Sequence, residues 1–287
     1  MPIDPVVAIG AELPQQSFAW TEDDVLLYHV ALGAGADPTD VGELRLATET
    51  DLRVLPTFAL VAPTFNMFEP PAVRLPGIDL DLASVLFGGQ ELVVHRPLPT
   101  HGRATMRARI ADVHDKGSAA VIVHECEGVG DDGEPLFTSR SSLFARGAGG
   151  FGGERGSSAR VAVPETKPDV DVTTPTLPQQ AWLYRLCGDR NPLHSDPGFA
   201  AAAGFARPIL HGLCSYGMVC KALVDHLLDG DPMPVLSFSA RFAGVVYPGE
   251  TLRTRAWRRE RVWVVSTTVV ERDDAPVIAD SVFAARG

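Results

Sequence analysis

A carboxylic acid and an imidazole lie five residues apart in GDRNPLHSD, residues 188–196, which contains Asp189 and His194. On a continuous helix this spacing directs two side chains to diverging faces. Pro192 also disfavours helix, because it lacks a backbone donor and restrains Asn191 to extended geometry. We predict an ordered turn that brings acid and base to one point, as proton transfer at adjacent atoms requires. The alternative is a turn whose polar residues serve only its own backbone, with an ordinary surface histidine.

The composition is that of an acidic globular protein. The chain has 287 residues and a net charge of -11, and its length suggests two domains. The negative charge argues against nucleic acid as a partner, because phosphate contacts need clustered lysines and arginines. No run of about 18 apolar residues occurs, so we expect no membrane insertion.

The cysteines and the N-terminus bear on location. Cys126, Cys187, Cys214 and Cys220 lack CxxC spacing and lie among apolar residues, which is typical of reduced, buried thiols. The first residues, MPIDPVVAIG, lack the charged region and cleavage site of a secretory leader. We therefore expect a cytoplasmic protein.

A stretch rich in glycine and then in proline, residues 147–176, is predicted to be a linker. It would separate an N-terminal domain, residues 1–146, from a C-terminal domain, residues 177–287. The linker begins with GAGGFG, which matches a dinucleotide-binding glycine pattern. We do not predict nucleotide binding there, because no apolar helical stripe follows and a phosphate-binding loop must open a helix.

The two flanking halves resemble each other, which predicts a repeat. Each begins with a helix-like segment, DDVLLYHVALG in the first half and QAWLYRLCG in the second. Each ends in strand-like runs of matching order. The runs LVVHRPLPTHGRATMRARIADV, SAAVIVHECEG and SSLFARG correspond to FSARFAGVVYPGETLRTRAWRR, VWVVSTTVVER and DSVFAARG.

The halves differ in the middle. The second has SDPGFAAAAG, a short helix that Asp196 caps, and then HGLCSYGMVCKALVDHLL, residues 211–228, a long buried helix. At that place the first half offers TFALVAPTFNMF and the proline-rich EPPAVRLPG, which allow at most a short helix. The first half also lacks the acid and the histidine, since AGADPTD follows Gly33.

The segment YRLCGDRNPLHSDPGFAAAAGFARPILHGLCSYG, residues 184–217, resembles the signature of the MaoC-like, hydratase 2 family, the (R)-specific enoyl-CoA hydratases. The resemblance includes the GDxNPLH core and the PILHGL stretch, and the flanking strands and degenerate first half extend it over most of the chain. It implies an α+β, double hot dog fold in which each repeat is an antiparallel sheet wrapping a helix. The N-terminal repeat would have a shortened central helix and would accommodate the acyl chain.

The resemblance also implies the roles of particular residues. Asp189 and His194 would be the catalytic pair, Gly212 N–H would bind the thioester oxygen, and Asn191 would orient the loop or the water. The reaction would be the reversible hydration of trans-2-enoyl-CoA to (R)-3-hydroxyacyl-CoA, the work of a hydro-lyase. Further candidates for contact with the acyl-CoA substrate are Ser215, Tyr216 and Arg190. Packing explains Ser215 and Tyr216 equally well, and ordinary surface charge explains Arg190 better than contact with CoA phosphates does.

The residue types suit this chemistry. Acid–base help from a carboxylate and an imidazole that flank one water is worth about 10² to 10⁴-fold. Charge that develops on the thioester oxygen meets unpaired N–H groups and a positive dipole at a helix start, where one donor is worth roughly 3 kcal/mol. We expect no cofactor and no metal, because His194, His211, Cys187 and Cys214 match no common zinc spacing.

Two other functions stay open from the residues alone. Hot dog folds also host thioesterases, in which water would attack the carbonyl carbon, and fold by itself does not settle function. A non-catalytic acyl-CoA-binding module is the second, although a pure binder has no need to hold Asp189 and His194 together. By analogy with other hot dog units we expect a homodimer, with a pseudo-dimeric monomer as the alternative.

Overall fold

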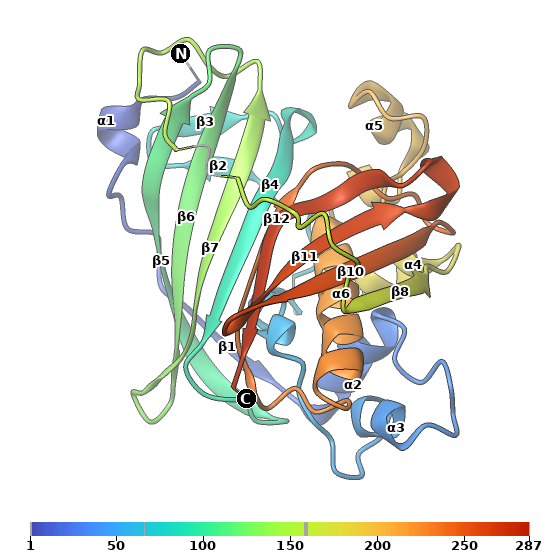
Figure 1. The fold of residues 1–287 in the computed structure, drawn as a ribbon. Helices are drawn as coiled ribbons and strands as arrows, with labels where there is room; N and C mark the ends of the chain where they lie inside the picture. The colour runs from blue at the N-terminus through green and yellow to red at the C-terminus, as the bar shows by residue number, and fades with distance from the viewer. Residues whose placement is uncertain (1, 66, 158–159, 287) are drawn as a thin grey trace.

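The computed structural model describes residues 2–65, 67–157 and 160–286. Within them, ten strands form one antiparallel sheet (Figure 1). The first half contributes β1 (Gln16–Trp20), β4 (Val85–Val94), β5 (Gly102–Asp115), β6 (Ala119–Gly130) and β7 (Pro135–Arg146). The second half contributes β8 (Val170–Pro175), β9 (Val235–Phe242), β10 (Thr251–Arg259), β11 (Val262–Val269) and β12 (Ala275–Ala285).

The strand order is symmetric about the centre of the sheet. It runs β1-β5-β6-β7-β4 in the first half and continues β9-β12-β11-β10-β8 in the second. The halves join where β4 pairs with β9, from Gly89 opposite Arg241 to Val93 opposite Ser237. The predicted repeat therefore has a structural basis, because corresponding strands occupy corresponding places.

Strand β8 corrects the predicted linker, which covered residues 147–176. The strand pairs with β10 from Val170 opposite Ala256 to Pro175 opposite Thr251, and it corresponds to β1 at the other edge of the sheet. Only alternate residues of β8 are partly buried, so the apolar signal is too weak to stand out among the surrounding prolines.

The helices that open the two halves lie where the sequence predicts them. These are α2 (Glu22–Ala31) and α4 (Gln180–Arg185), and their tyrosines Tyr28 and Tyr184 lie with ring centroids 6.2 Å apart. A short helix after α2, α3 (Val41–Ala47), was not predicted. The short helix predicted after the acid–histidine turn is α5 (Pro197–Ala202), and Asp196 caps it as predicted. Other short elements are α1 (Pro5–Ala8), β2 (Val73–Leu75), β3 (Ile78–Leu80), η3 (Leu82–Ser84) and η5 (Val270–Arg272).

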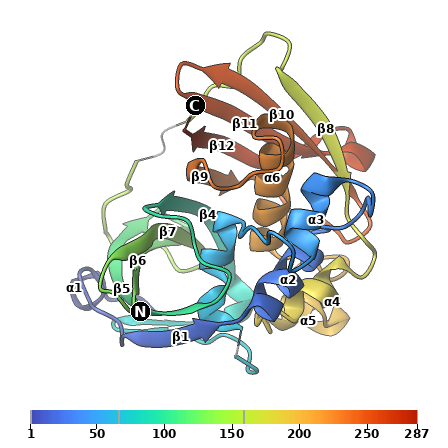
Figure 2. The same cartoon turned by 90° about the horizontal axis from the view of Figure 1, so that it is seen from below.

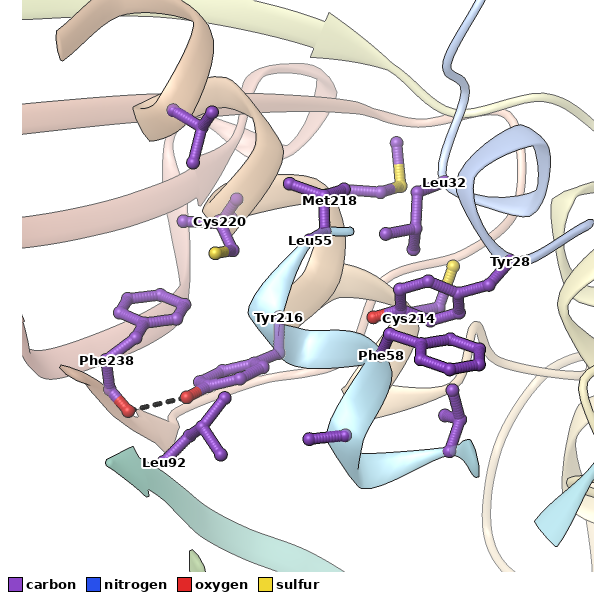
Figure 3. Close-up of a cluster of buried hydrophobic side chains, with 14 of the residues drawn as sticks. Tyr28, Leu32, Leu55, Phe58, Leu92, Cys214, Tyr216, Met218, Cys220 and Phe238 are labelled. Carbon is purple, nitrogen blue, oxygen red and sulfur yellow. Dashed lines mark hydrogen bonds between the residues drawn. The ribbon is translucent and has the colours of Figure 1, made fainter. Parts of the chain in front are cut away.

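The long helix α6 (Gly212–Leu227) confirms the central helix predicted for the second half. It lies against the second-half strands, and Tyr216 stacks on Phe238 of β9 at 4.3 Å between centroids (Figures 2 and 3). The corresponding part of the first half holds two 3₁₀ turns, η1 (Pro56–Leu60) and η2 (Ala62–Thr64). Pro63 prevents a helix that begins at η1 from continuing through η2, because its ring lacks an N–H and would clash with the carbonyl of Ala59. The α+β double hot dog with a shortened first helix is thus confirmed.

One hydrophobic core joins the halves. It contains Phe58 of η1 together with Tyr216 of α6 and Phe238 of β9 (Figure 3). All four cysteines are free, with Cys126 half-buried and the others buried. None of the helices in the described residues has the length and hydropathy of a transmembrane span.

Candidate active site

The acid–histidine segment is an ordered turn, as predicted. The short 3₁₀ turn η4 (Pro192–His194) begins after Asn191, whose Oδ1 accepts the Leu193 N–H at 3.0 Å. Asp189 Oδ1 accepts the Asn191 N–H at 3.0 Å. These bonds curl the backbone so that the side chains of residues 189 and 194 approach each other.

Gly188 fixes where this turn begins. Its φ is +105°, a region that favours glycine, and a Cβ at this position would lie 1.9 Å from the Thr64 carbonyl oxygen. Thr64 Oγ1 also donates to the Cys187 carbonyl oxygen at 3.3 Å. Since Thr64 belongs to η2, the first half packs against the turn that carries Asp189 and supports it.

The imidazole of His194 is held in one orientation and one tautomer. Its Nδ1 lies 2.9 Å from the Ile209 carbonyl oxygen, and because a carbonyl only accepts, Nδ1 carries the hydrogen. Nε2 then has a free lone pair. Burial lowers the pKa of His194 below its usual 6.5, and the nearby Asp189 charge opposes this only in part. The ring is therefore a neutral base at pH 7.

His211 lies between the rings of His194 and Tyr184. Its ring stacks on His194 with centroids 3.8 Å apart and planes 30° apart, and Tyr184 lies 4.9 Å from it on centroids. Burial holds the pKa of His211 well below the usual range, and the His194 ring acts in the same direction. A neutral ring packed against His194 restricts its rotation without adding charge.

Three potential metal ligands meet here. One atom each of Asp189, His194 and His211 lies within 4.8 Å of the others. Imidazole binds a metal through an in-plane lone pair, and two stacked rings direct those lone pairs nearly parallel instead of toward one ion. His194 Nδ1 is moreover occupied by the Ile209 carbonyl. The donor set does not fit a metal centre.

The start of α6 presents free backbone donors. The carbonyl of His211, its N-cap residue, accepts from Cys214 N–H at 3.1 Å and Ser215 N–H at 3.2 Å. Gly212 N–H and Leu213 N–H donate to none of the described residues. These two groups add to the positive end of the helix dipole, and the combination suits an oxyanion.

A cavity of about 410 Å³ brings these groups together, within the range of small-molecule sites. From the second half, polar and backbone groups line it: Asp189, Asn191, His194, Gly212, Leu213 and Ser215. From the first half come residues of β2, β4, β6 and β7, none of which was among the predicted site residues.

Two of the predicted substrate contacts do not line this cavity. Tyr216 is fully buried, and its hydroxyl donates to the Phe238 carbonyl oxygen at 2.5 Å, so it supports the core instead of lining the cavity. Arg190 does not line the cavity, and its guanidinium lies 5.7 Å from the Phe68 ring centroid. Tyr184 and Ile209, which hold the two histidine rings in place, were not among the predicted site residues. Tyr184 could have been found, because it matches Tyr28 in the repeat.

A larger hollow of about 650 Å³ lies on the other face of the first-half strands. Glu125 and Arg140 line it and form an ion pair. Glu125 directly follows the cavity residue His124, and Arg140 directly precedes the cavity residue Ser141. Because successive side chains of a strand point to opposite faces, Glu125 and Arg140 point away from the cavity. None of the residues of the turn lines this charged hollow, whereas Asp189, Asn191 and His194 line the smaller cavity.

Comparisons with known proteins agree on one family. The family described as MaoC like domain matches residues 160–277, and the MFE-2 hydratase 2 N-terminal domain matches residues 18–147. The chain is 54% identical to enoyl-CoA hydratase ChsH3 of Mycobacterium tuberculosis, over 97% of this chain and 98% of that protein. It is 41% identical to 3-hydroxyacyl-thioester dehydratase Y of the same organism, over 96% and 94%. A solved MaoC-like dehydratase from Phytophthora capsici is 29% identical with a TM-score of 0.87, covering 98% of this chain and 96% of that one.

Proposed function

The chain belongs to the MaoC-like, hydratase 2 family, and from this we propose that Asp189 and His194 are the pair with which it hydrates trans-2-enoyl-CoA to (R)-3-hydroxyacyl-CoA. The enzyme is a hydratase or dehydratase of acyl thioesters, as its relatives are named. The observation that carries the residue assignment is that a carboxylate, a free imidazole nitrogen and two free backbone N–H groups line one cavity.

The pair acts on one water molecule. His194 Nε2, the lone pair left free by the bond from Nδ1 to Ile209, accepts a proton from water. The Asp189 carboxylate accepts a hydrogen bond from the water's other O–H, whose hydrogen stays on the oxygen, and so orients that oxygen toward C3 of the substrate. The water oxygen bonds to C3, the π electrons move toward the thioester oxygen, and the imidazolium returns the proton to C2. Water is added across the double bond and both residues end unchanged.

The start of α6 stabilises the intermediate charge. As the water oxygen attacks C3, the thioester oxygen becomes enolate-like, and the free N–H groups of Gly212 and Leu213 are available to it. Gly212 leaves the approach open, because its nearest non-neighbouring atoms, in the Phe242 ring, lie 3.5 Å from where a Cβ would be. The substrate carbonyl can therefore reach the backbone.

The first half accommodates the acyl chain. The cavity continues from the Asp–His turn to apolar side chains of the first half, including Val73, Val85, Phe87 and Leu143. The missing central helix leaves this space. We accordingly assign residues 1–146 to acyl-chain binding and the C-terminal repeat, which also includes β8, to catalysis.

The same site serves both directions of the reaction. Hydration and dehydration pass through one transition state, so supply and removal of metabolites set the direction. The reaction involves no net oxidation, and Asp189 and His194 supply its acid–base steps, so no cofactor is needed. We propose further that the protein acts in the cytoplasm as a homodimer, since β1 and β8 are the outermost strands of its sheet.

One assay tests the proposal. Purified protein is mixed with short and medium trans-2-enoyl-CoA esters, and loss of the conjugated enoyl absorbance is followed. The product is then offered to dehydrogenases specific for the (R) or the (S) alcohol. We expect hydration and an (R) product. An (S) product would contradict the stereochemical assignment, and release of free CoA from a saturated acyl-CoA without hydration would favour a thioesterase.

A further inference from the structure

The first-half wall of the cavity is apolar with two exceptions. His124 on β6 and Ser141 on β7 line it among residues such as Val85, Phe87 and Leu143. The mechanism uses neither of them. A polar pair in an otherwise apolar acyl-binding wall requires a separate explanation, because burying polar groups without partners is unfavourable.

The two side chains are neighbours without protein partners. His124 lies directly opposite Ser141 in the β6–β7 pairing, where Cβ atoms are about 5 Å apart. The Nε2 atom of His124 is buried and has no hydrogen-bond partner among the described residues. None of the described side chains or backbone groups bonds to the Ser141 hydroxyl either. Both groups are thus available to a molecule in the cavity.

Their place in the sheet sets them apart from the thioester. Gly212 lies beside Phe242 of β9, and the strand order from there is β9-β4-β7-β6. Two to three strand spacings separate β9 from Ser141 and His124, roughly 10 to 14 Å along the sheet. A ligand group that meets them lies several carbon atoms beyond the reacting double bond.

The electrostatics restrict the kind of ligand group. Burial lowers the pKa of His124 below its usual value, so its imidazole is neutral at pH 7 and offers one donor and one acceptor. The charged residues next in sequence, Glu125 and Arg140, point to the opposite face of the sheet. A neutral hydroxyl or keto oxygen suits such a pair better than a carboxylate.

We propose that His124 and Ser141 bind an oxygen-bearing group on the substrate's acyl chain, several carbons from the thioester. The preferred substrate is then a 2-enoyl-CoA with a remote hydroxyl or keto group instead of a plain alkyl chain. This inference rests on the hydratase function proposed above and adds the substrate class. A site built to hydrogen-bond such a group discriminates against analogues that lack it, because its buried polar atoms are then left unpaired.

The test compares matched substrates. Medium-chain trans-2-enoyl-CoA esters of one length carry a single hydroxyl or keto group at successive carbons toward the chain end, and the plain ester is the reference. We expect kcat/KM for the best-placed oxygen to exceed that of the plain ester by roughly 10- to 100-fold. In His124→Phe this ratio should fall to near one, and Ser141→Ala should lower it several-fold.

Ser142→Ala is the matched control, because Ser142 lies on the same strand with its side chain on the opposite face; it should keep the wild-type ratio. A wild-type ratio near one for every oxygen position, or an unchanged ratio in Ser141→Ala and His124→Phe, would overturn the inference. Hydration of the plain ester in the same experiment would leave the proposed function standing in that case. Hydration of no ester at all would instead refute the function.

Discussion

In the second half, α6 occupies the concave side of the sheet, whereas in the first half the corresponding segment is reduced to the turns η1 and η2. The surrounding strands keep the same order in both halves. The halves differ in the segment that packs against these strands, and the cavity extends into the half that lacks the long helix. One repeat therefore supplies a helix start with free N–H groups, and the other supplies the space that we propose for the acyl chain.

The halves are not independent in this division. Thr64 of η2 contacts Gly188 so closely that no side chain fits there, and it hydrogen-bonds the Cys187 carbonyl. The shortened segment therefore does more than leave space. It also supports the turn that carries Asp189, so the geometry of catalysis in one half depends on packing from the other.

The largest expected effect comes from removing the chemistry that only the second half has. Asp189→Asn and His194→Gln keep the size and polarity of each side chain but remove the carboxylate charge and the basic ring nitrogen. We expect each to lower kcat about 10³-fold in the hydration assay, with circular dichroism and melting temperature near wild type. His101→Gln in the exposed part of the first half is the control. Retention of a tenth of the wild-type kcat in either variant would refute the assignment.

The next effect separates the helix start from the pair. Gly212→Pro removes one N–H, and proline is favoured in the first turn of a helix. The preceding residue, His211, already has the extended ψ of 134° that proline requires. We expect kcat to fall about 10² to 10³-fold with the fold retained. Gly212→Ala keeps the N–H and should lose much less. Equal losses in both variants would mean that bulk, and not the donor, matters.

The sequence predicted the second half better than the first, for physical reasons. The turn at residues 188–196, the buried helix and the last four strands follow from proline, glycine and apolar spacing, which act locally. The wall of the cavity does not, because β2, β4, β6 and β7 meet the turn only through tertiary packing. The place of Arg190 outside this lining could not be predicted for the same reason, because its position next to Asp189 in the sequence does not determine which way its side chain turns.

The pH dependence of activity should follow the protonation of His194, one of the buried histidines. Because burial lowers the pKa of His194, the neutral, basic form persists from alkaline pH to below 6.5. Protonation removes the base as pH falls through the lowered pKa, so kcat/KM should then drop toward tenfold per pH unit. The measurement is kcat/KM between pH 4.5 and 8, with reassay at pH 7 to confirm that the enzyme survives the acid. If the fall of kcat/KM toward acid pH were instead centred above pH 6.5, the pKa of His194 in the free enzyme would not be lowered, and the prediction would be wrong.

The smallest expected effect concerns stability and the histidine of the first half. His29 is fully buried; its Nδ1–H donates to the Leu46 carbonyl at 2.8 Å, and its Nε2 accepts from Leu55 N–H at 3.1 Å. Both nitrogens are thus occupied, unlike those of His194. Burial lowers the pKa of His29 to about 4, whereas in the unfolded chain it is about 6.5.

Between these two values the unfolded state binds a proton that the folded state does not, so acid weakens the fold. The loss from His29 alone is about 1.4 kcal/mol per pH unit, or about 2 kcal/mol at pH 5. Urea unfolding at several pH values measures it. Glutamine does not titrate, so in His29→Gln the free energy of unfolding should fall less between pH 6.5 and 5 than in the wild type, by about 1.4 kcal/mol per pH unit. At pH 7 this variant should be less stable than the wild type. His101→Gln, at an exposed position, is the control and should keep the wild-type slope. A slope unchanged by His29→Gln would mean that water reaches this ring in the folded protein, and the first half would then be less tightly packed around α2 than its contacts indicate.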